Sequence, residues 1–159
     1  MELVSVAALG SNRVIGDDGG LPWPPIPSDR RTYRERVSDS PVVLGRRTFE
    51  SMRGDLPGTE QVVLSRSLDS VETATARLVR NVADALDVAA SLGAETTYVL
   101  GGESVYRTLQ PHLDRMALSR VAGDHDGDAF YPAWDRREWL RESATEYGRF
   151  TLEEWVRRR

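Results

Sequence analysis

Hydrophobic residues along this chain fall in short, β-branched runs that alternate with segments of helical spacing. Runs of that kind bounded by turn residues are typical of buried strands, while apolar positions three and four residues apart indicate one-sided helices. The pattern predicts strands over residues 3–9, 41–44, 61–65, 77–79, 96–100 and 115–121, and helices over 29–37, 48–52, 82–91 and 104–109. Strands that alternate with helices predict an α/β fold with a largely parallel sheet.

The pattern changes after Asp128, where helical spacing stops. Residues 139–147 and 150–157 form two further strand-like runs on either side of Gly148, which is typical of an antiparallel hairpin. No repeat, linker or low-complexity tract interrupts the order, so we expect residues 1–159 to form one domain.

Composition excludes several kinds of chemistry. The chain has no cysteine, and all 21 of its basic residues are arginine. Thiolate zinc sites, disulfides, P-loop nucleotide sites and Schiff-base mechanisms are therefore excluded. With two histidines, we expect no metal site. A net charge of −4, with arginines scattered along the sequence, argues against a non-specific nucleic-acid partner.

We expect a cytoplasmic protein with no membrane partner. The apolar run near the N-terminus is too short to span a bilayer, and it lacks a basic flank.

The most informative segment is residues 16–33, in which a glycine-rich stretch precedes a proline-rich one. The glycines predict a mobile lid, and the prolines predict a rigid shelf beside it. We expect Ser28 to cap the next helix, with Asp29 in its first turn and Tyr33 one turn later on the same face. Taken alone, Asp29 would more often serve only to stabilise the helix N-terminus, but the flanking Leu21-Pro22-Trp23 and the spacing to Tyr33 favour a functional role.

Two later segments combine a strand, glycine and a helix start. In residues 42–53 a glycine is followed by Arg46, Arg47 and Thr48, a pattern that suits an anion site but also fits a solvated turn. In residues 98–106 the pair Gly101-Gly102 would let the backbone approach a ligand. It is not a Rossmann fingerprint, because no G-x-G-x-x-G occurs there.

The order of these motifs resembles that of the dihydrofolate reductase family over essentially the whole chain. Leu21-Pro22-Trp23, followed by Pro27, Asp29 and Tyr33, is similar to the opening third of that family. The later segments at 42–53, 62–66, 98–106 and 118–132 follow in family order. The resemblance implies a central, mixed, mostly parallel eight-stranded sheet with a C-terminal antiparallel hairpin and about four helices. It also implies NADPH-dependent reduction of 7,8-dihydrofolate to 5,6,7,8-tetrahydrofolate, and antifolates as inhibitors of a monomeric enzyme.

The resemblance also assigns roles to individual residues. Asp29 would polarise the pterin and assist its protonation, supported by Ser119, with Leu21 and Trp23 on the lid. The substrate would contact Val6, Ala7, Ala8, Asp29, Arg30, Tyr33, Arg34, Met52, Arg53 and Leu100. The cofactor would contact Ala8, Ile15, Gly16, Leu21, Gly45, Arg46, Arg47, Thr48, Leu64, Ser65, Arg66, Leu100, Gly101, Gly102, Glu103, Ser104, Val105, Tyr106 and Asp128. In the family the glycine pair carries a cis peptide, and an aspartate at the position of Asp128 holds the lid closed.

Among the departures from the family pattern, those at Thr59 and Glu103 bear most directly on ligand binding. Thr59 stands where the family usually places an arginine that clamps the glutamate tail of folate, and threonine cannot form that bidentate pair. We hypothesise that Arg30, Arg34 and Arg53 take over this role. Glu103 stands where a small residue usually lies near the cofactor pyrophosphate. It would repel that anion unless it turns to solvent.

Three other functions remain open from the sequence. The chain could be the riboflavin-pathway reductase of the same fold, although that enzyme would need a second phosphate site and would lack the Leu-Pro-Trp lid with this aspartate. It could be a non-catalytic module that binds a dinucleotide or folate. It could also be an interaction scaffold that uses the tryptophans at 134, 139 and 155, which we instead expect to cover the sheet edge.

Overall fold

The computed structural model describes residues 1–159, which form an eight-stranded sheet and a separate two-stranded one. In chain order the elements are β1 (Glu2–Leu9), β2 (Val14–Gly16), α1 (Pro27–Val37), β3 (Val42–Gly45), α2 (Arg46–Ser51), β4 (Gln61–Leu64), β5 (Ala76–Val79), α3 (Val82–Ser91), β6 (Thr96–Val99), α4 (Glu103–Leu109), a 3₁₀ turn (Gln110–His112), β7 (Arg115–Val121), β8 (Ala129–Phe130), β9 (Trp139–Glu146) and β10 (Phe150–Arg157).

The large sheet has the strand order β5-β4-β3-β6-β1-β7-β10-β9. The strands from β5 to β7 are parallel, whereas β10 pairs antiparallel with both β7 and β9. The predicted mixed, mostly parallel eight-stranded sheet with a C-terminal antiparallel hairpin and four helices is therefore confirmed.

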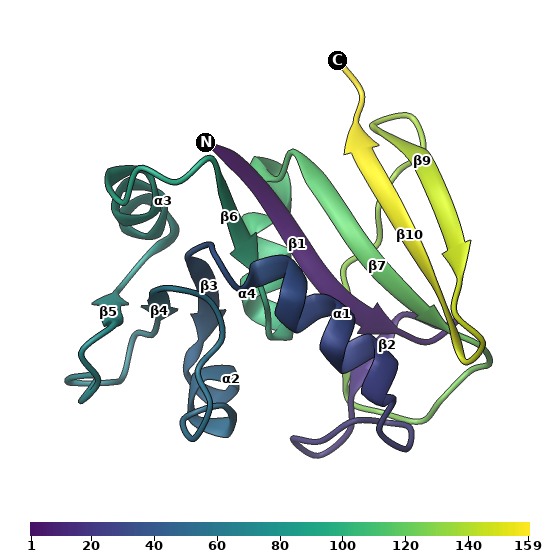
Figure 1. Ribbon diagram of the computed structural model, residues 1–159, viewed down its shortest axis with the longest axis horizontal. Helices are drawn as coiled ribbons and strands as arrows, with labels where there is room; N and C mark the ends of the chain where they lie inside the picture. The colour runs from purple at the N-terminus through teal and green to yellow at the C-terminus, as the bar shows by residue number, and fades with distance from the viewer.

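Helices cover both faces of the sheet. Successive residues of a strand point to opposite faces, so they pack against different helices. On β3, Val42 and Leu44 pack in one apolar cluster with Val37 of α1 and Phe49 of α2. Val43, between them, belongs to the cluster that contains α3 and α4. In Figure 1, α1 crosses in front of the sheet and α4 lies behind it. Because both faces are covered, the inner strands are mostly apolar, with buried polar exceptions such as Ser5, Thr97 and Ser119.

The small sheet of β2 and β8 was not predicted. These strands have three and two residues, too few to show a periodic pattern, and they pair across more than 110 residues of sequence. Together they hold the start of the lid against the loop that follows β7.

The predicted cap of the first helix is wrong. Helix α1 begins at Pro27, Ile26 occupies the N-cap position with extended backbone, and no side chain caps the helix. Ser28 therefore lies within the first turn, where its carbonyl accepts a hydrogen bond from the Thr32 hydroxyl. Proline is well suited to the first helical position because its fixed φ matches the helix and its missing N–H is not needed there. Asp29 still lies in the first turn, as expected.

The outermost strand β9 exposes every residue after Trp139 to solvent. The tryptophans at 139 and 155 are buried beneath the hairpin, and Trp134 is half-buried beside them. These side chains fill the core under the sheet edge, as expected, instead of forming an exposed aromatic surface. No helix of the protein has the length and apolar character needed to cross a membrane.

Candidate active site

Asp29 and Ser119 meet where the first turn of α1 lies against the end of β7. The Ser119 hydroxyl donates a hydrogen bond to Asp29 Oδ1 at 2.6 Å. Burial raises the pKa of the Asp29 carboxyl above its ordinary value, and the hydrogen bond from Ser119 partly opposes this by stabilising the ionised form. The predicted support of Asp29 by a serine hydroxyl is thus present in the structure.

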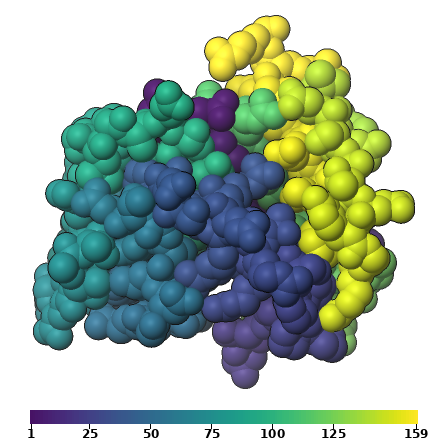
Figure 2. All heavy atoms as spheres, in the orientation of Figure 1, coloured from purple at the N-terminus to yellow at the C-terminus, as the bar shows by residue number.

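A cleft of about 1690 Å³ opens in front of this pair. It lies at the carboxyl ends of β1, β3, β4 and β6, the edge at which parallel α/β sheets usually bind ligands. Figure 2 shows the surface indented between the part of the molecule that holds α2 and the part that holds the lid and the start of α1.

All but three of the predicted site residues line this cleft. They come from seven separate stretches of sequence: Val6, Ala7, Ala8, Ile15, Gly16, Leu21, Trp23, Asp29, Arg30, Tyr33, Gly45, Arg46, Arg47, Thr48, Met52, Leu64, Ser65, Arg66, Leu100, Gly102, Glu103, Ser104, Val105, Tyr106, Ser119 and Asp128.

Gly101 is one of the three exceptions, because it is buried immediately behind the lining. The peptide bond between Gly101 and Gly102 is cis, as the family resemblance implied. The Gly101 carbonyl accepts a hydrogen bond from the Gly45 N–H at 2.8 Å. This bond ties together the two glycine turns that border the cleft.

Arg34 and Arg53 are the other exceptions. Arg34 Nη2 donates to the Asp55 backbone carbonyl at 2.7 Å and lies 3.6 Å from the Asp55 carboxylate. The Arg53 guanidinium packs over the Phe49 ring, 5.2 Å from its centroid. Of the three arginines expected to replace the missing arginine at Thr59, the structure therefore brings only Arg30 to the cleft.

The glycine-rich lid is a tight hairpin turn. Asp17 and Gly20 exchange two backbone hydrogen bonds of 3.0 Å, and the central residues Asp18 and Gly19 have φ of 48° and 81°. Positive φ at both central positions is the signature of a type I′ turn, which favours Asp-Gly. Both Asp128 carboxylate oxygens lie 3.3 Å from the Asp18 N–H, so the predicted contact between Asp128 and the lid is present.

The opposite end of the cleft is cationic. Arg46, Arg47 and Arg66 line it, and none of their guanidinium groups makes an ion pair within the protein. Ser65 is buried next to them, and its oxygen accepts the Leu68 N–H at 3.1 Å, which leaves the hydroxyl hydrogen free to donate. Arginine forks and hydroxyl donors of this kind suit phosphate groups.

The sequence did not point to two further arginines of this cleft, Arg80 and Arg107. Arg80 Nη1 donates to the Ser65 carbonyl at 3.1 Å. A signal for Arg80 was available, since it directly follows β5, and the carboxyl ends of neighbouring parallel strands meet at the same edge. Arg107 lies within α4 and has no such signal in the sequence.

Tyr106 fixes the backbone of β1 beside the cleft. Its hydroxyl donates to the Val6 carbonyl at 2.6 Å, and its ring centroid lies 4.9 Å from that of Tyr131, whose hydroxyl contacts the buried Ser5 hydroxyl. Burial raises the pKa of Tyr106 well above its ordinary value and also raises the pKa of Tyr131, so both phenols stay neutral at physiological pH.

One oxygen of the Glu103 carboxylate is engaged by a backbone N–H at the edge of the cleft. Its Oε1 accepts the backbone N–H of Phe130 at 3.0 Å and thereby ties the start of α4 to β8. The residue still lines the cleft, so the sequence-based expectation that its negative charge opposes an anion there stays a prediction.

This chain matches known proteins of one family over nearly its whole length. Residues 2–153 match the family model described as dihydrofolate reductase. Dihydrofolate reductase 1 of Haloarcula marismortui is 40% identical over 170 aligned positions, which cover 97% of this chain and 90% of that protein. Dihydrofolate reductase HdrB of Haloferax volcanii is 39% identical over 147 positions, which cover 88% of this chain and 75% of that protein.

A solved structure shows the same similarity in three dimensions. The dihydrofolate reductase of Enterococcus faecalis, in complex with NADP(H) and RAB-propyl, superposes with a TM-score of 0.82 at 26% identity, covering 98% of this chain and 96% of that one. The matched fold, the family model and the sequence identity agree, and this chain is a member of the dihydrofolate reductase family.

Proposed function

We propose that Asp29 binds and polarises the pterin in the reaction of this family, the NADPH-dependent reduction of 7,8-dihydrofolate to 5,6,7,8-tetrahydrofolate. The protein is an NADPH-dependent oxidoreductase. The observation that supports the role of Asp29 is its position, half-buried and held by Ser119, at the end of the cleft opposite Arg46, Arg47 and Arg66.

The other carboxyl groups of the cleft are less suited to this role. Asp18, Glu50 and Asp128 are exposed, so water competes for their hydrogen bonds. Glu103 is engaged by the Phe130 N–H. Asp29 is the carboxyl group of the cleft whose pKa is raised by burial, which is a common property of residues that take part in proton transfer.

Asp29 acts on the substrate through its charge and its two oxygens. Ser119 holds Oδ1, so the carboxylate has a fixed orientation toward the cleft. In that orientation it accepts hydrogen bonds from the amino group and the adjacent ring N–H of the pterin. The negative charge then raises the basicity of the ring nitrogen that receives the proton.

The residues at the cationic end fit the cofactor. When bound, NADPH supplies the hydride that goes to the pterin C=N bond. Arg46, Ser65 and Arg66 would hold the 2′-phosphate, and Arg47 with Thr48 the pyrophosphate, because these guanidinium and hydroxyl donors are uncommitted and line one cavity. A side chain at Gly45 would come within 3.2 Å of Val105, so glycine keeps this wall open.

The lid completes the site. Leu21 lines the cleft yet is 56% exposed, so an apolar side chain faces solvent at its mouth. Closure over a bound pterin would bury Leu21 and exclude bulk water, while Val6, Tyr33, Met52 and Leu100 supply the remaining apolar wall.

The test is Asp29→Asn, followed by NADPH absorbance with and without dihydrofolate over a pH series. We expect NADPH binding to be retained and turnover at neutral pH to fall by about 10²- to 10⁴-fold, the usual contribution of a positioned acid or base. The loss should be smaller at acid pH, where solvent supplies protons more readily.

Asp39→Asn is a matched control, because Asp39 is exposed just beyond the end of α1 and lies outside the cleft. Equal activity of parent and Asp29→Asn across the pH range would refute the role of Asp29. A parent protein that binds NADPH and methotrexate but never oxidises the cofactor would instead be a non-catalytic binding module.

The cleft is also expected to accept antifolates, because they share the flat heterocycle of the substrate. We further propose that residues 1–159 act as one monomeric domain in the cytoplasm. Support for the monomer comes from β9, whose exposed residues are mostly polar or charged, with Leu140 as the one large apolar exception. The absence of cysteine is consistent with a reducing compartment.

A further inference from the structure

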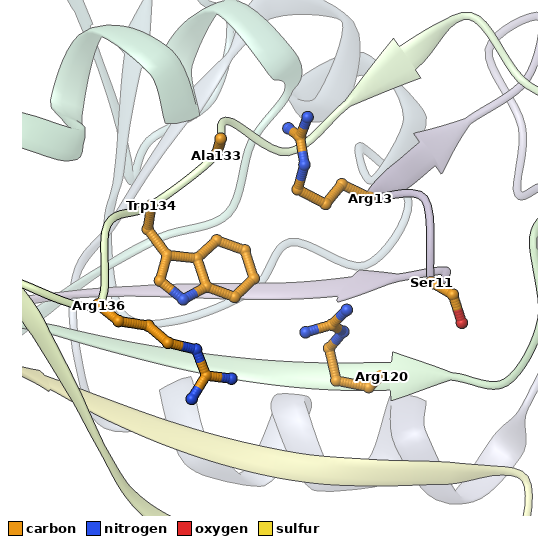
Figure 3. Close-up of a pocket in the computed structure, with 6 residues that line it drawn as sticks. All are labelled: Ser11, Arg13, Arg120, Ala133, Trp134 and Arg136. Carbon is orange, nitrogen blue, oxygen red and sulfur yellow. The ribbon is translucent and has the colours of Figure 1, made fainter.

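A second, smaller hollow lies on the other side of the sheet from Asp29. It has a volume of about 260 Å³ and is lined by Ser11, Arg13, Arg120, Ala133, Trp134 and Arg136. Figure 3 shows the three arginine side chains arranged around the Trp134 ring. None of the six residues lines the active-site cleft.

Strand β7 separates the two sites. Ser119 points to Asp29, whereas the next residue, Arg120, lines the hollow. Alternate residues of a strand point to opposite faces, so the two sites share a strand but no side chain.

Two of the arginines are held in place by hydrogen bonds. Arg13 Nη1 donates to the Tyr131 carbonyl. Arg120 Nη1 donates to Glu153 Oε1 at 3.3 Å, and its guanidinium carbon lies 5.5 Å from the Trp134 ring centroid. Each of these contacts fixes a long side chain before any ligand arrives, which lowers the entropy lost on binding.

The third arginine, Arg136, is positioned by stacking alone. Its guanidinium carbon lies 5.2 Å from the Trp155 ring centroid, and its side chain makes no ion pair. A guanidinium stacked on an aromatic face still presents its N–H groups at its edges. All of the Arg136 donors are therefore available to a ligand in the hollow.

The hollow carries an excess of positive charge in a protein whose net charge is −4. No acidic residue lines it. The nearby carboxylate of Glu153 is shared, since Oε1 pairs with Arg120 and Oε2 pairs with Arg141 at 3.2 Å. The Nε of Arg120 is buried and has no hydrogen-bond partner. The lining therefore keeps a net positive charge, because Arg13 and Arg136 have no counter-charge and the one carboxylate near Arg120 is shared with Arg141.

We propose that this hollow is a binding site for a compact oxyanion of the phosphate class, separate from the active site. Guanidinium groups bind phosphate through paired N–H donors, and here three arginines line one hollow. The volume is smaller than the about 300 Å³ at which sites for drug-sized ligands begin. The site therefore fits a phosphate or pyrophosphate group, either free or at the end of a larger molecule that extends into solvent.

The test is calorimetric titration of pyrophosphate into the full chain at fixed ionic strength, with the cofactor cleft saturated by NADPH. We expect one binding event whose dissociation constant rises at least fivefold in Arg136→Gln and in Arg13→Gln. Adenosine diphosphate forms the second arm: equal affinity identifies a site for the free anion, and tighter binding with the same dependence on both arginines identifies a nucleotide site.

Arg31→Gln is the matched control, since Arg31 is exposed on α1, makes no ion pair and lines neither cavity. It changes the net charge equally and should leave binding unchanged. Thermal unfolding without anion shows that each variant is folded, and Arg136→Gln removes no hydrogen bond of the free protein. Absence of binding to the parent, or binding equal in the parent and both hollow variants, overturns the proposal.

Discussion

The hydrogen bond from Ser119 to Asp29 makes the pH dependence of turnover a direct test of the site. Ser119→Ala removes a 2.6 Å donor that stabilises the ionised carboxylate and leaves the effect of burial unopposed. The pKa of Asp29 should therefore rise further. We expect the change in turnover that depends on Asp29 to move to higher pH in this variant.

The size of the effect follows from the kind of bond that is lost. A hydrogen bond to a charged group contributes about 1.5–3 kcal/mol, and because Asp29 is only half-buried the lower value applies. About 1.5 kcal/mol corresponds to roughly a tenfold change in the ratio of ionised to protonated Asp29 at a given pH.

The assay is steady-state turnover from NADPH absorbance across the pH range at saturating substrate and cofactor. Asp29→Asn should lack the transition, and Ser143→Ala, an exposed serine on β9, should leave it in place. If Ser119→Ala is folded and the midpoint of the transition does not move, the reasoning that Ser119 stabilises the Asp29 carboxylate is wrong.

Three further predictions concern stability. Burial raises the folded-state pKa of Asp29 above 3.8, so the folded protein holds this proton more tightly than the unfolded chain, and the parent loses stability as pH rises from 3.8 through the folded-state pKa. In urea unfolding, Asp29→Asn should therefore gain stability relative to the parent as pH rises across that range. A difference in stability that stays constant with pH would contradict this. Gly127→Ala would place a Cβ in steric overlap with the Gly16 carbonyl oxygen, so thermal unfolding should show a loss of about 1–3 kcal/mol, and an unchanged midpoint would contradict the close packing. Tyr131→Phe leaves the buried Ser5 hydroxyl without its partner, so the free energy of unfolding should fall by about 1–3 kcal/mol. The double variant Tyr131→Phe with Ser5→Ala should recover much of that loss. Losses that simply add in the double variant would rule out coupling between Tyr131 and Ser5.

The parts of the fold that were predictable depend on short-range patterns. Strands such as 115–121 and helices such as 82–91 carry enough residues for their apolar spacing to be read, and the structure has both with the predicted bounds. The start of α1 was misjudged because Ser28 and Pro27 each suit a helix N-terminus, and proline took the first position.

Within the cleft, residues that belong to contiguous motifs were predictable, and residues placed by tertiary structure were not. The segment from Leu21 to Tyr33 carries its own signal, and those of its residues that were assigned to the site reach the cleft. Arg34 stands at a position where the family often holds the glutamate tail of folate, yet here it pairs with the carboxylate of Asp55, 21 residues away. The clustering of Arg13, Arg120 and Arg136 was also missed, because arginines scattered along the sequence meet only once β2 and β7 are in place.

The two outer strands of the sheet bear on how molecules of this protein meet at high concentration. An edge strand offers unpaired N–H and C=O groups that could recruit a strand from another molecule. Here β5 has only four residues and exposes Arg77, while β9 exposes Arg141, Glu142 and Glu146. An incoming strand would have to strip water from these charges, so intermolecular strand pairing, the first step toward fibrous aggregates, is opposed at both margins.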